Sequence, residues 1–308
     1  MKICVATPDI IGPIRNGGVG TAFLGLCEAL RDAGHDVSVF YTSDHYEQGS
    51  AAYWKAEFRN RHAIEFIALS DAPPSKALFQ PLPGVTGDVA RSFRVYTYLK
   101  ARRDFDIIHF PDYLGIGYFT VMAKAVGLDF QSTPIMVTAH GPLAWSHTYD
   151  FATSRDLRPL LCGVFEKFVV EHADALVSPS RFMLDWFADQ GWTLPQRAVH
   201  AFNRLPASLA APAAAGDSVP TTDSRVTELV FFGRIEQRKG VYLFIDAVNQ
   251  LLGESASLLE GVKITFLGKL NQASVPRSIL DLRLAAWPLT WSCMQDLTAE
   301  QAHACLSP

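Results

Sequence analysis

Short runs of β-branched and aromatic residues alternate along the chain with longer segments of helical periodicity. Within residues 157–169, apolar side chains recur at the three-four spacing of an amphipathic helix, and residues 20–33 behave similarly. This alternation predicts βαβ units and therefore an α/β fold with a parallel sheet. The strands expected in the first two thirds of the chain are Lys2–Ala6, Asp36–Tyr41, Ala63–Leu69, Asp106–Phe110, Ile135–Ala139 and Ala175–Ser178, with a further candidate at Ala198–Phe202.

The periodicity stops between Pro206 and Ser224, where the chain is rich in Ala, Pro, Ser and Thr. A second β-α-β pattern follows, with a strand at Glu228–Phe232, a helix at Lys239–Leu252 and a strand at Val262–Leu267. The rest, Lys269–Pro308, contains no convincing strand. We therefore expect a Rossmann-like domain over residues 1–205, a linker over 206–225 and a partial second domain over 226–308, because a doubly wound domain needs about twice that length.

Composition narrows the class of protein. The 308 residues are 49% hydrophobic, enough for a large core, and the net charge is only -4 with a pI near 6.1. Lysine and arginine are scattered, which argues against a nucleic-acid partner. The five cysteines are far apart and form no C-x-x-C pair, so we expect reduced, mostly buried thiols in a cytoplasmic protein. No segment has the length of a signal peptide core or a membrane span, so any membrane contact would be peripheral, at the inner face.

A glycine-rich segment follows the first strand and leads into a helix. Gly17, Gly18 and Gly20 would let backbone N–H groups approach a ligand, and a helix N-terminus favours anions, so the segment is a candidate phosphate cradle. A flexible loop with Gly20 easing the turn is an equally good reading. Phe23 stands where the dinucleotide fingerprint needs a small residue, which argues against a nicotinamide or flavin dehydrogenase.

Two histidines follow strands at the same predicted edge of the sheet. His109 and Asp112 come at the end of the fourth strand, and His140 comes after the fifth. A lone histidine there is more often structural, but two of them near a carboxylate favour a functional site, since ligands bind outside the carboxyl ends of parallel strands. His140 is the stronger candidate for a catalytic role.

One acidic pair resembles a metal site but is placed wrongly for one. Asp104-Phe105-Asp106 has the D-x-D spacing, yet it lies at the entry end of its strand, away from the candidate site. A solvated turn is the simpler interpretation. We therefore expect neither a metal nor another cofactor.

Two basic residues flank the first turn after a strand of the second domain. Arg234 comes just past that strand and Lys239 stands at the expected helix start. A guanidinium and an ammonium beside a positive helix end suit a diphosphate. The plainer reading, ordinary surface charges, is outweighed by their spacing.

Taken together, these motifs resemble glycosyltransferase family 4, the retaining GT-B enzymes that use nucleotide sugars. The resemblance covers most of the chain and implies two Rossmann-like doubly wound domains, the second incomplete here. It also implies that Arg234 and Lys239 hold the donor diphosphate, that the Gly17–Gly20 loop closes over the donor and that His140 lies beside the transferred sugar. The segments that carry it are Gly17-Gly18-Val19-Gly20, Ala33-Gly34-His35-Asp36-Val37, Asp106-Ile107-Ile108-His109, Thr138-Ala139-His140-Gly141, Ala173 to Ser180, Phe232-Gly233-Arg234, Lys239-Gly240 and Phe266-Leu267-Gly268.

One further position matches the family, and two positions depart from it. Glu166 matches a frequent family glutamate, though a charge on the helix surface is the simpler account. Asn203 is followed by Arg204 where the family often has glycine. The family's two glutamates seven residues apart have no counterpart after Gly268. We therefore expect a chain truncated before that motif, with weak donor binding.

The leading hypothesis is transfer of a hexose from a nucleotide-diphosphate sugar to a glycan or lipid-linked acceptor, with retention and without a metal. His109, Asp112 and Trp145 are candidate contacts to the acceptor or sugar. Two alternatives stay open: a non-catalytic remnant or acceptor-binding module, favoured by the missing acidic pair, and a nucleotide-sugar epimerase with the same architecture.

Overall fold

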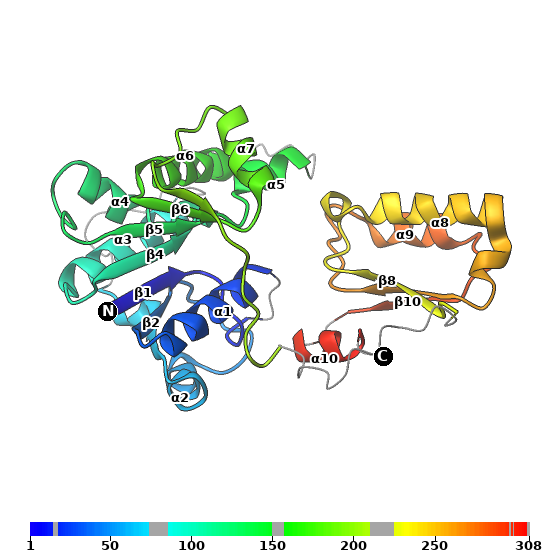
Figure 1. Cartoon of the computed structure of the whole chain (residues 1–308), viewed down its shortest axis with the longest axis horizontal. Coiled ribbons are helices and arrows are strands. Elements are labelled where there is room, and N and C mark those ends of the chain that lie inside the picture. Colours follow the sequence, from blue (N-terminus) through cyan, green and yellow to red (C-terminus); the bar gives the residue numbers. More distant parts are fainter. Residues whose placement is uncertain are drawn as a thin grey trace. The chain divides into compact units, whose positions relative to one another are not determined.

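A computed structural model of the chain describes residues 1–14, 18–73, 86–149, 157–209, 225–295, 297 and 299–306. The chain divides into two compact units, the first formed by Met1–Ser146 with Thr153–Ala207 and the second by Ser208–Pro308 with His147–Ala152. Each unit has its own parallel sheet (Figure 1). The predicted α/β class is therefore confirmed. Most of the predicted linker, residues 210–224, lies outside the described part.

The sheet of the first unit has seven parallel strands in the order β3-β2-β1-β4-β5-β6-β7. All seven were expected from the sequence, and their ends differ from expectation by at most two residues. The strands are β1 (Lys2–Thr7), β2 (Asp36–Tyr41), β3 (Glu65–Ala68), β4 (Ile107–Pro111), β5 (Ile135–Thr138), β6 (Ala175–Ser178) and β7 (Ala198–His200).

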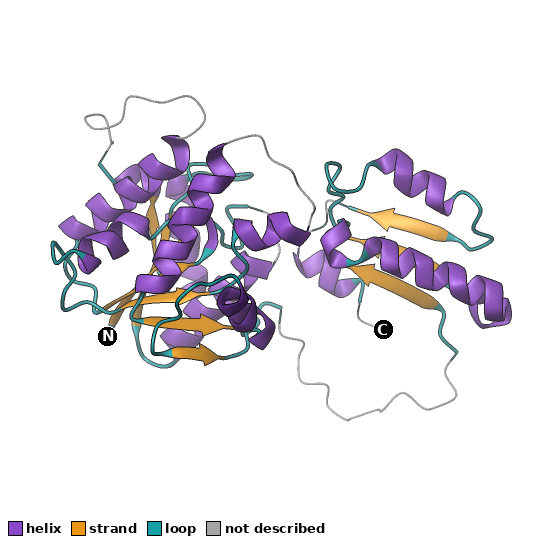
Figure 2. Ribbon diagram, turned by 90° about the horizontal axis from the view of Figure 1, so that it is seen from above, coloured by secondary structure: helices purple, strands orange, loops and turns teal. Residues whose placement is uncertain are grey.

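Helices cover both faces of this sheet (Figures 1 and 2). Because side chains alternate along a strand, Ile3 and Val5 of β1 join one core with α1 and α2, whereas Cys4 and Ala6 join the other with α3, α4 and α6. This is a doubly wound arrangement. The helices are α1 (Gly18–Asp32), α2 (Ala51–His62), α3 (Thr86–Ala101), α4 (Tyr118–Ala125), α5 (Leu143–Tyr149), α6 (Leu157–His172) and α7 (Arg181–Asp189).

The order of strands reverses between β1 and β4. From β1 the chain proceeds to β2 and β3 on one side, then crosses back and adds β4, β5, β6 and β7 on the other. Segments that leave the carboxyl ends of β1 and β4 therefore diverge, and in open α/β sheets ligands bind at this switch point. The start of α1 and the segments after β4 and β5 all belong to this edge.

The second unit has a three-stranded parallel sheet in the order β10-β9-β8, with α8 and α9 on one side (Figure 1). The expectation of no strand after Lys269 was wrong, because Trp291–Met294 pairs with Ile264–Leu267. This strand contains no β-branched residue and is only half-buried, so its sequence gives a weak signal. The elements are β8 (Glu228–Phe232), β9 (Lys263–Leu267), β10 (Trp291–Met294), α8 (Val241–Ser255), α9 (Arg277–Leu284) and α10 (Ala299–Ala304).

Two expectations from composition can be compared with the structure. All five cysteines are free thiols, and Cys4, Cys27 and Cys162 are buried, as predicted. Within the described ranges, no helix is both long and apolar enough to cross a bilayer.

Candidate functional site

The start of α1 lies at the switch point, directly after the segment that leaves β1. Gly20 is buried there, and a Cβ atom on it would lie 2.6 Å from Asp9 Oδ1 and 3.0 Å from the carbonyl carbon of Ile10. Gly18 is exposed, with open space around it. Gly20 is thus required for packing, whereas Gly18 leaves the first helical turn accessible to an anion. Gly17 lies outside the described residues.

His140 follows β5 and turns its ring toward α1. The ring packs against Phe23, with 4.9 Å between centroids. Its Nε2 atom is buried and has no hydrogen-bond partner among the residues that the structure describes. Burial lowers the pKa of His140 to about 4, so the imidazole is neutral at pH 7. A neutral ring with an unsatisfied buried nitrogen is suited to hydrogen-bond a ligand.

His109 lies on β4 beside the same phenylalanine. Its side chain is buried, and Nε2 lies 2.6 Å from Thr138 Oγ1 on β5. Burial lowers its pKa to about 3, with nearby His140 acting in the same direction. The structure therefore brings His109 close to His140 but gives it a partner within the sheet, as expected of a structural histidine.

Asp112 ends the same stretch of chain after β4, and it is fully buried. Its Oδ1 accepts a hydrogen bond from the backbone N–H of His140 at 2.9 Å, and Oδ2 accepts one from Gly141 at 3.1 Å. Burial raises the pKa of Asp112 to about 7, opposed by these two amides. Asp112 therefore fixes the backbone of the segment after β5 through two hydrogen bonds.

The same segment also packs against Trp145 of α5. Gly141 has φ +102, and a Cβ atom on it would lie 2.8 Å from the Trp145 ring. This close approach needs glycine. Trp145 is partly buried and lies over the backbone that follows His140.

Glu166 of α6 does not lie on the helix surface. The expectation of a charge on that surface was wrong, because the side chain is fully buried. Its Oε1 accepts hydrogen bonds from the backbone N–H of Leu114 at 2.9 Å and of Leu143 at 3.0 Å. Burial raises its pKa to about 8. Helical periodicity could not reveal this, since it does not show which face a neighbouring segment covers.

In the second unit, the segments after β8 and β9 remain paired beyond the strands. The N–H of Ile235 donates to the carbonyl of Lys269, and the N–H of Asn271 donates to Ile235. Gly233 and Gly268 have φ of +138 and +149, and a Cβ atom on Gly268 would lie 2.0 Å from the Gly233 carbonyl oxygen. The two glycines therefore allow this edge to form.

Arg234 projects from the paired segment. Its side chain is 53% exposed, and Nη2 lies 3.7 Å from Oε1 of Glu236, which is buried. Glu236 also forms an ion pair with Arg238, whose side chain is 8% exposed, and accepts from Asn271 Nδ2 at 3.3 Å. Glu236 thus lies within ion-pair distance of one accessible guanidinium. Glu236 was not among the residues predicted from the sequence, although its place between two arginines was a usable signal.

Lys239 lies close by in sequence but not where the sequence put it. It is the last residue of the 3-10 turn Gln237–Lys239, and α8 begins only after Gly240, which has φ +81. The side chain is exposed. Arg234 and Lys239 therefore both follow the carboxyl end of β8.

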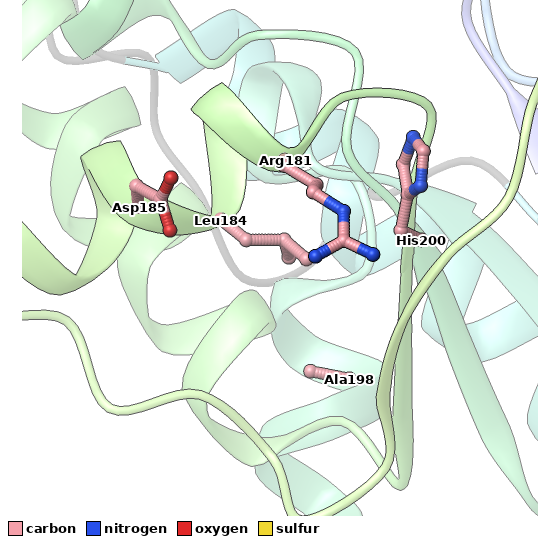
Figure 3. A pocket seen from close by; sticks show the side chains of 5 residues that line it. All are labelled: Arg181, Leu184, Asp185, Ala198 and His200. Atoms are coloured by element: carbon pink, nitrogen blue, oxygen red, sulfur yellow. The ribbon is translucent and has the colours of Figure 1, made fainter.

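A pocket of about 340 Å³ opens between α7 and the edge strand β7 (Figure 3). The Arg181 side chain extends across it toward β7, which carries Ala198 and His200 (Figure 3). Leu184 and Asp185 complete the lining. None of these residues was predicted from the sequence, since the pocket depends on the pairing of β6 with β7.

The D-x-D segment is engaged in ion pairs at the other end of β4. Asp104 lies 3.2 Å from Lys2 Nζ and 3.0 Å from Arg102 Nε, and Asp106 accepts from the backbone N–H of Lys2. Across the described ranges, no group of three or more His, Cys, Asp or Glu side chains is arranged to hold a metal ion.

Comparison with known proteins gives both a family and a fold. Residues 17–204 match the family described as glycosyl transferase 4-like domain. No curated protein matches the chain. Among solved structures, a sucrose-phosphate synthase from Thermosynechococcus elongatus is similar with a TM-score of 0.62 and 15% identity, over 97% of this chain and 71% of that one.

Two further structures were solved with ligands. The catalytic domain of starch synthase IV from Arabidopsis thaliana, bound to ADP and acarbose, has a TM-score of 0.57 and 13% identity, over 98% of this chain and 75% of that one. A TarM variant from S. aureus, in complex with Fondaparinux, alpha-GlcNAc-glycerol and UDP, has a TM-score of 0.60 and 8% identity, over 99% and 79%. At such identities the likeness concerns the fold, and this fold is GT-B-like.

Proposed function

Since the chain belongs to the glycosyl transferase 4-like family, we propose that it transfers a hexose from a nucleotide-diphosphate sugar to a glycan or lipid-linked acceptor, with retention of configuration. The observation that carries this proposal is the pair Arg234 and Lys239 after β8, with buried Glu236 within ion-pair distance of Arg234. Two similar proteins were solved with UDP or ADP, which supports a nucleotide diphosphate as part of the donor.

The chemical problem in this reaction is the charge that develops on the departing diphosphate. A guanidinium can bind phosphate oxygens through two parallel hydrogen bonds, and an ammonium adds a second positive charge. Glu236 lies within ion-pair distance of Arg234 and would limit the positions of its guanidinium, so less ordering would be needed when the ligand arrives. Arg234 and Lys239 would therefore stabilise the leaving group as its charge grows, without a metal.

The first unit would contribute to the same reaction through its own edge. The first turn of α1, with accessible Gly18 and tightly packed Gly20, offers backbone N–H groups to an anion. Neutral His140 would hydrogen-bond a hydroxyl of the transferred sugar through Nε2. In this proposal His109 and Asp112 support His140 rather than contact the acceptor, and Trp145 shapes the wall of the sugar site.

Calorimetric titration with UDP, GDP and ADP tests the donor site directly. We expect saturable binding of at least one diphosphate, weakened roughly 10- to 100-fold in Arg234→Ala, since a charge-assisted hydrogen bond contributes about 1.5–3 kcal/mol. Arg283→Ala is the matched control, because Arg283 is also half-exposed and lies 3.1 Å from Asp246, but at the end of α9. Absence of binding up to millimolar ligand, or equal weakening in both variants, would refute the proposal.

The reaction itself is followed by NMR of the anomeric protons of donor and product. Retention predicts a product with the anomeric configuration of the donor. Free epimerised donor without transfer would instead indicate an epimerase, and acceptor binding without turnover would indicate a binding module.

A further inference from the structure

Two carboxylates are buried near the switch point of the first unit. Asp112 and Glu166 are both fully buried, and the charge of Asp112 acts on Glu166. They come from different elements, the end of β4 and the middle of α6. Burying two acids carries a cost in free energy, because an ionised carboxylate loses its hydration there.

What the carboxylates bind is backbone, at three different places. Asp112 accepts from His140 and Gly141, the two residues after β5, with one oxygen for each amide. Glu166 accepts from Leu114, after β4, and from Leu143, at the start of α5, with a single oxygen. The segments that leave β4 and β5 are thus tied to each other and to α6.

One of these segments is held in a strained conformation. Leu114 has φ +62, in the left-handed region that side chains other than glycine rarely adopt. Next to it, a Cβ atom on Gly115 would lie 2.3 Å from the Cβ atom of Phe165 on α6. The hydrogen bond from the Leu114 amide to Glu166 helps to keep this turn in place, and the same Glu166 oxygen holds the amide of Leu143, three residues after His140.

We propose that Asp112 and Glu166 are positioning residues that fix His140 and the amide of Gly141 at the sheet edge without touching the substrate. This inference rests on the proposed function of His140. Misplacing a group at a reaction centre by about 1 Å can cost on the order of 100-fold in rate, so bonds that fix the position of His140 would affect the rate of transfer.

The two carboxylates differ in a way that makes the proposal testable. In Asp112 each oxygen accepts a separate amide, so Asp112→Asn must turn an NH2 group toward an N–H donor and break one bond. In Glu166 one oxygen, Oε1, accepts the bonds from both Leu114 and Leu143, while Oε2 has no hydrogen-bond partner among the described residues. Glu166→Gln can therefore keep both bonds, whereas Glu166→Ala loses them.

The experiment combines turnover with amide hydrogen exchange in the full chain. We expect kcat to fall roughly 10- to 100-fold in Asp112→Asn and Glu166→Ala, with faster exchange at residues 140–143 and diphosphate affinity within twofold of wild type. Glu166→Gln should recover most of the loss. Glu171→Ala on the same helix, which removes a bond from the Thr193 amide, is the control and should change neither readout.

The readouts separate this inference from the proposed function. Unchanged exchange protection of the β1 amides shows that each variant folds. Faster exchange at residues 140–143 with unchanged kcat would overturn the positioning role while transfer stands. If the wild-type chain transfers no sugar, the proposed function fails. The pattern of exchange across the three variants still tests whether the hydrogen bonds of Asp112 and Glu166 hold residues 140–143. Equal exchange in all variants would refute that these bonds hold the segment.

Discussion

Replacement of Gly268 by alanine should destabilise the paired segments that follow β8 and β9 in the second unit. The residue has φ +149, and a new Cβ atom would lie 2.0 Å from the Gly233 carbonyl oxygen and 2.6 Å from its carbon. Backbone strain of this kind costs about 1–3 kcal/mol. The contact must also lengthen by more than 1 Å to reach about 3.4 Å, the start of ordinary van der Waals contact.

The neighbouring backbone cannot give way freely. Gly233 donates to the carbonyl of Leu267 at 2.9 Å, and Ile235 donates to Lys269 at 2.9 Å, so a shift of Gly233 weakens at least one of these bonds. Such a loss adds about 1 kcal/mol. We expect a total destabilisation of about 3 kcal/mol in the second unit, together with weaker diphosphate binding, because Arg234 follows Gly233 directly.

Hydrogen exchange measured by mass spectrometry can localise this effect. Peptides from β8 and β9 should exchange on the order of 100-fold faster, corresponding to about 3 kcal/mol, while peptides from β1 and β4 stay unchanged. Gly253→Ala in α8 is the control, since nothing lies within 4 Å of a Cβ atom there. Exchange of β8 and β9 in Gly268→Ala within about threefold of wild type would contradict the reasoning.

Two further predictions concern the first unit. Ala63 ends α2 in the left-handed conformation, with φ +53, and is exposed. Ala63→Gly should therefore stabilise the unit by about 1 kcal/mol and raise Tm by about 2–4 °C, whereas Ala56→Gly inside α2 should lower Tm. A lower Tm for Ala63→Gly would contradict this account. Because the pKa of His109 is lowered to about 3 in the folded state, this imidazole is protonated between pH 7 and pH 5 only in the unfolded state. The free energy of unfolding of the wild type should therefore fall by about 2 kcal/mol through this group. In urea titrations the stability difference between wild type and His109→Gln should shrink by that amount at pH 5, and a constant difference would show that His109 is not buried neutral.

The sheet of the first unit could be predicted because its strands are apolar runs bounded by polar turns. Ile3 and Val5 face one core and Cys4 and Ala6 the other, so the whole run reads as strand whichever face is considered. Trp291–Met294 offers no such run, and its pairing with β9 depends on contacts distant in sequence.

The candidate site was predictable as a location but not as a set of roles. Strand ends and parallel topology were enough to bring His109, Asp112 and His140 to one edge. The sequence could not show that the oxygens of Asp112 point at backbone amides, nor that Glu166 reaches the same place from α6. Those roles depend on the packing of a helix against loops, which local periodicity does not encode.

The central place of β1 has a consequence for how the chain folds during synthesis. β1 pairs with β2 on one side and with β4 on the other, and Lys2 bonds Asp106 across 104 residues of sequence. At about 5–20 residues per second, a ribosome needs on the order of 5–20 s to make that stretch. During this time the first three strands expose the unpaired edge of an apolar strand, a surface that other nascent chains can join. The central strand β1 is therefore also the strand most exposed to aggregation during synthesis. Chaperones that bind extended apolar segments would act there first.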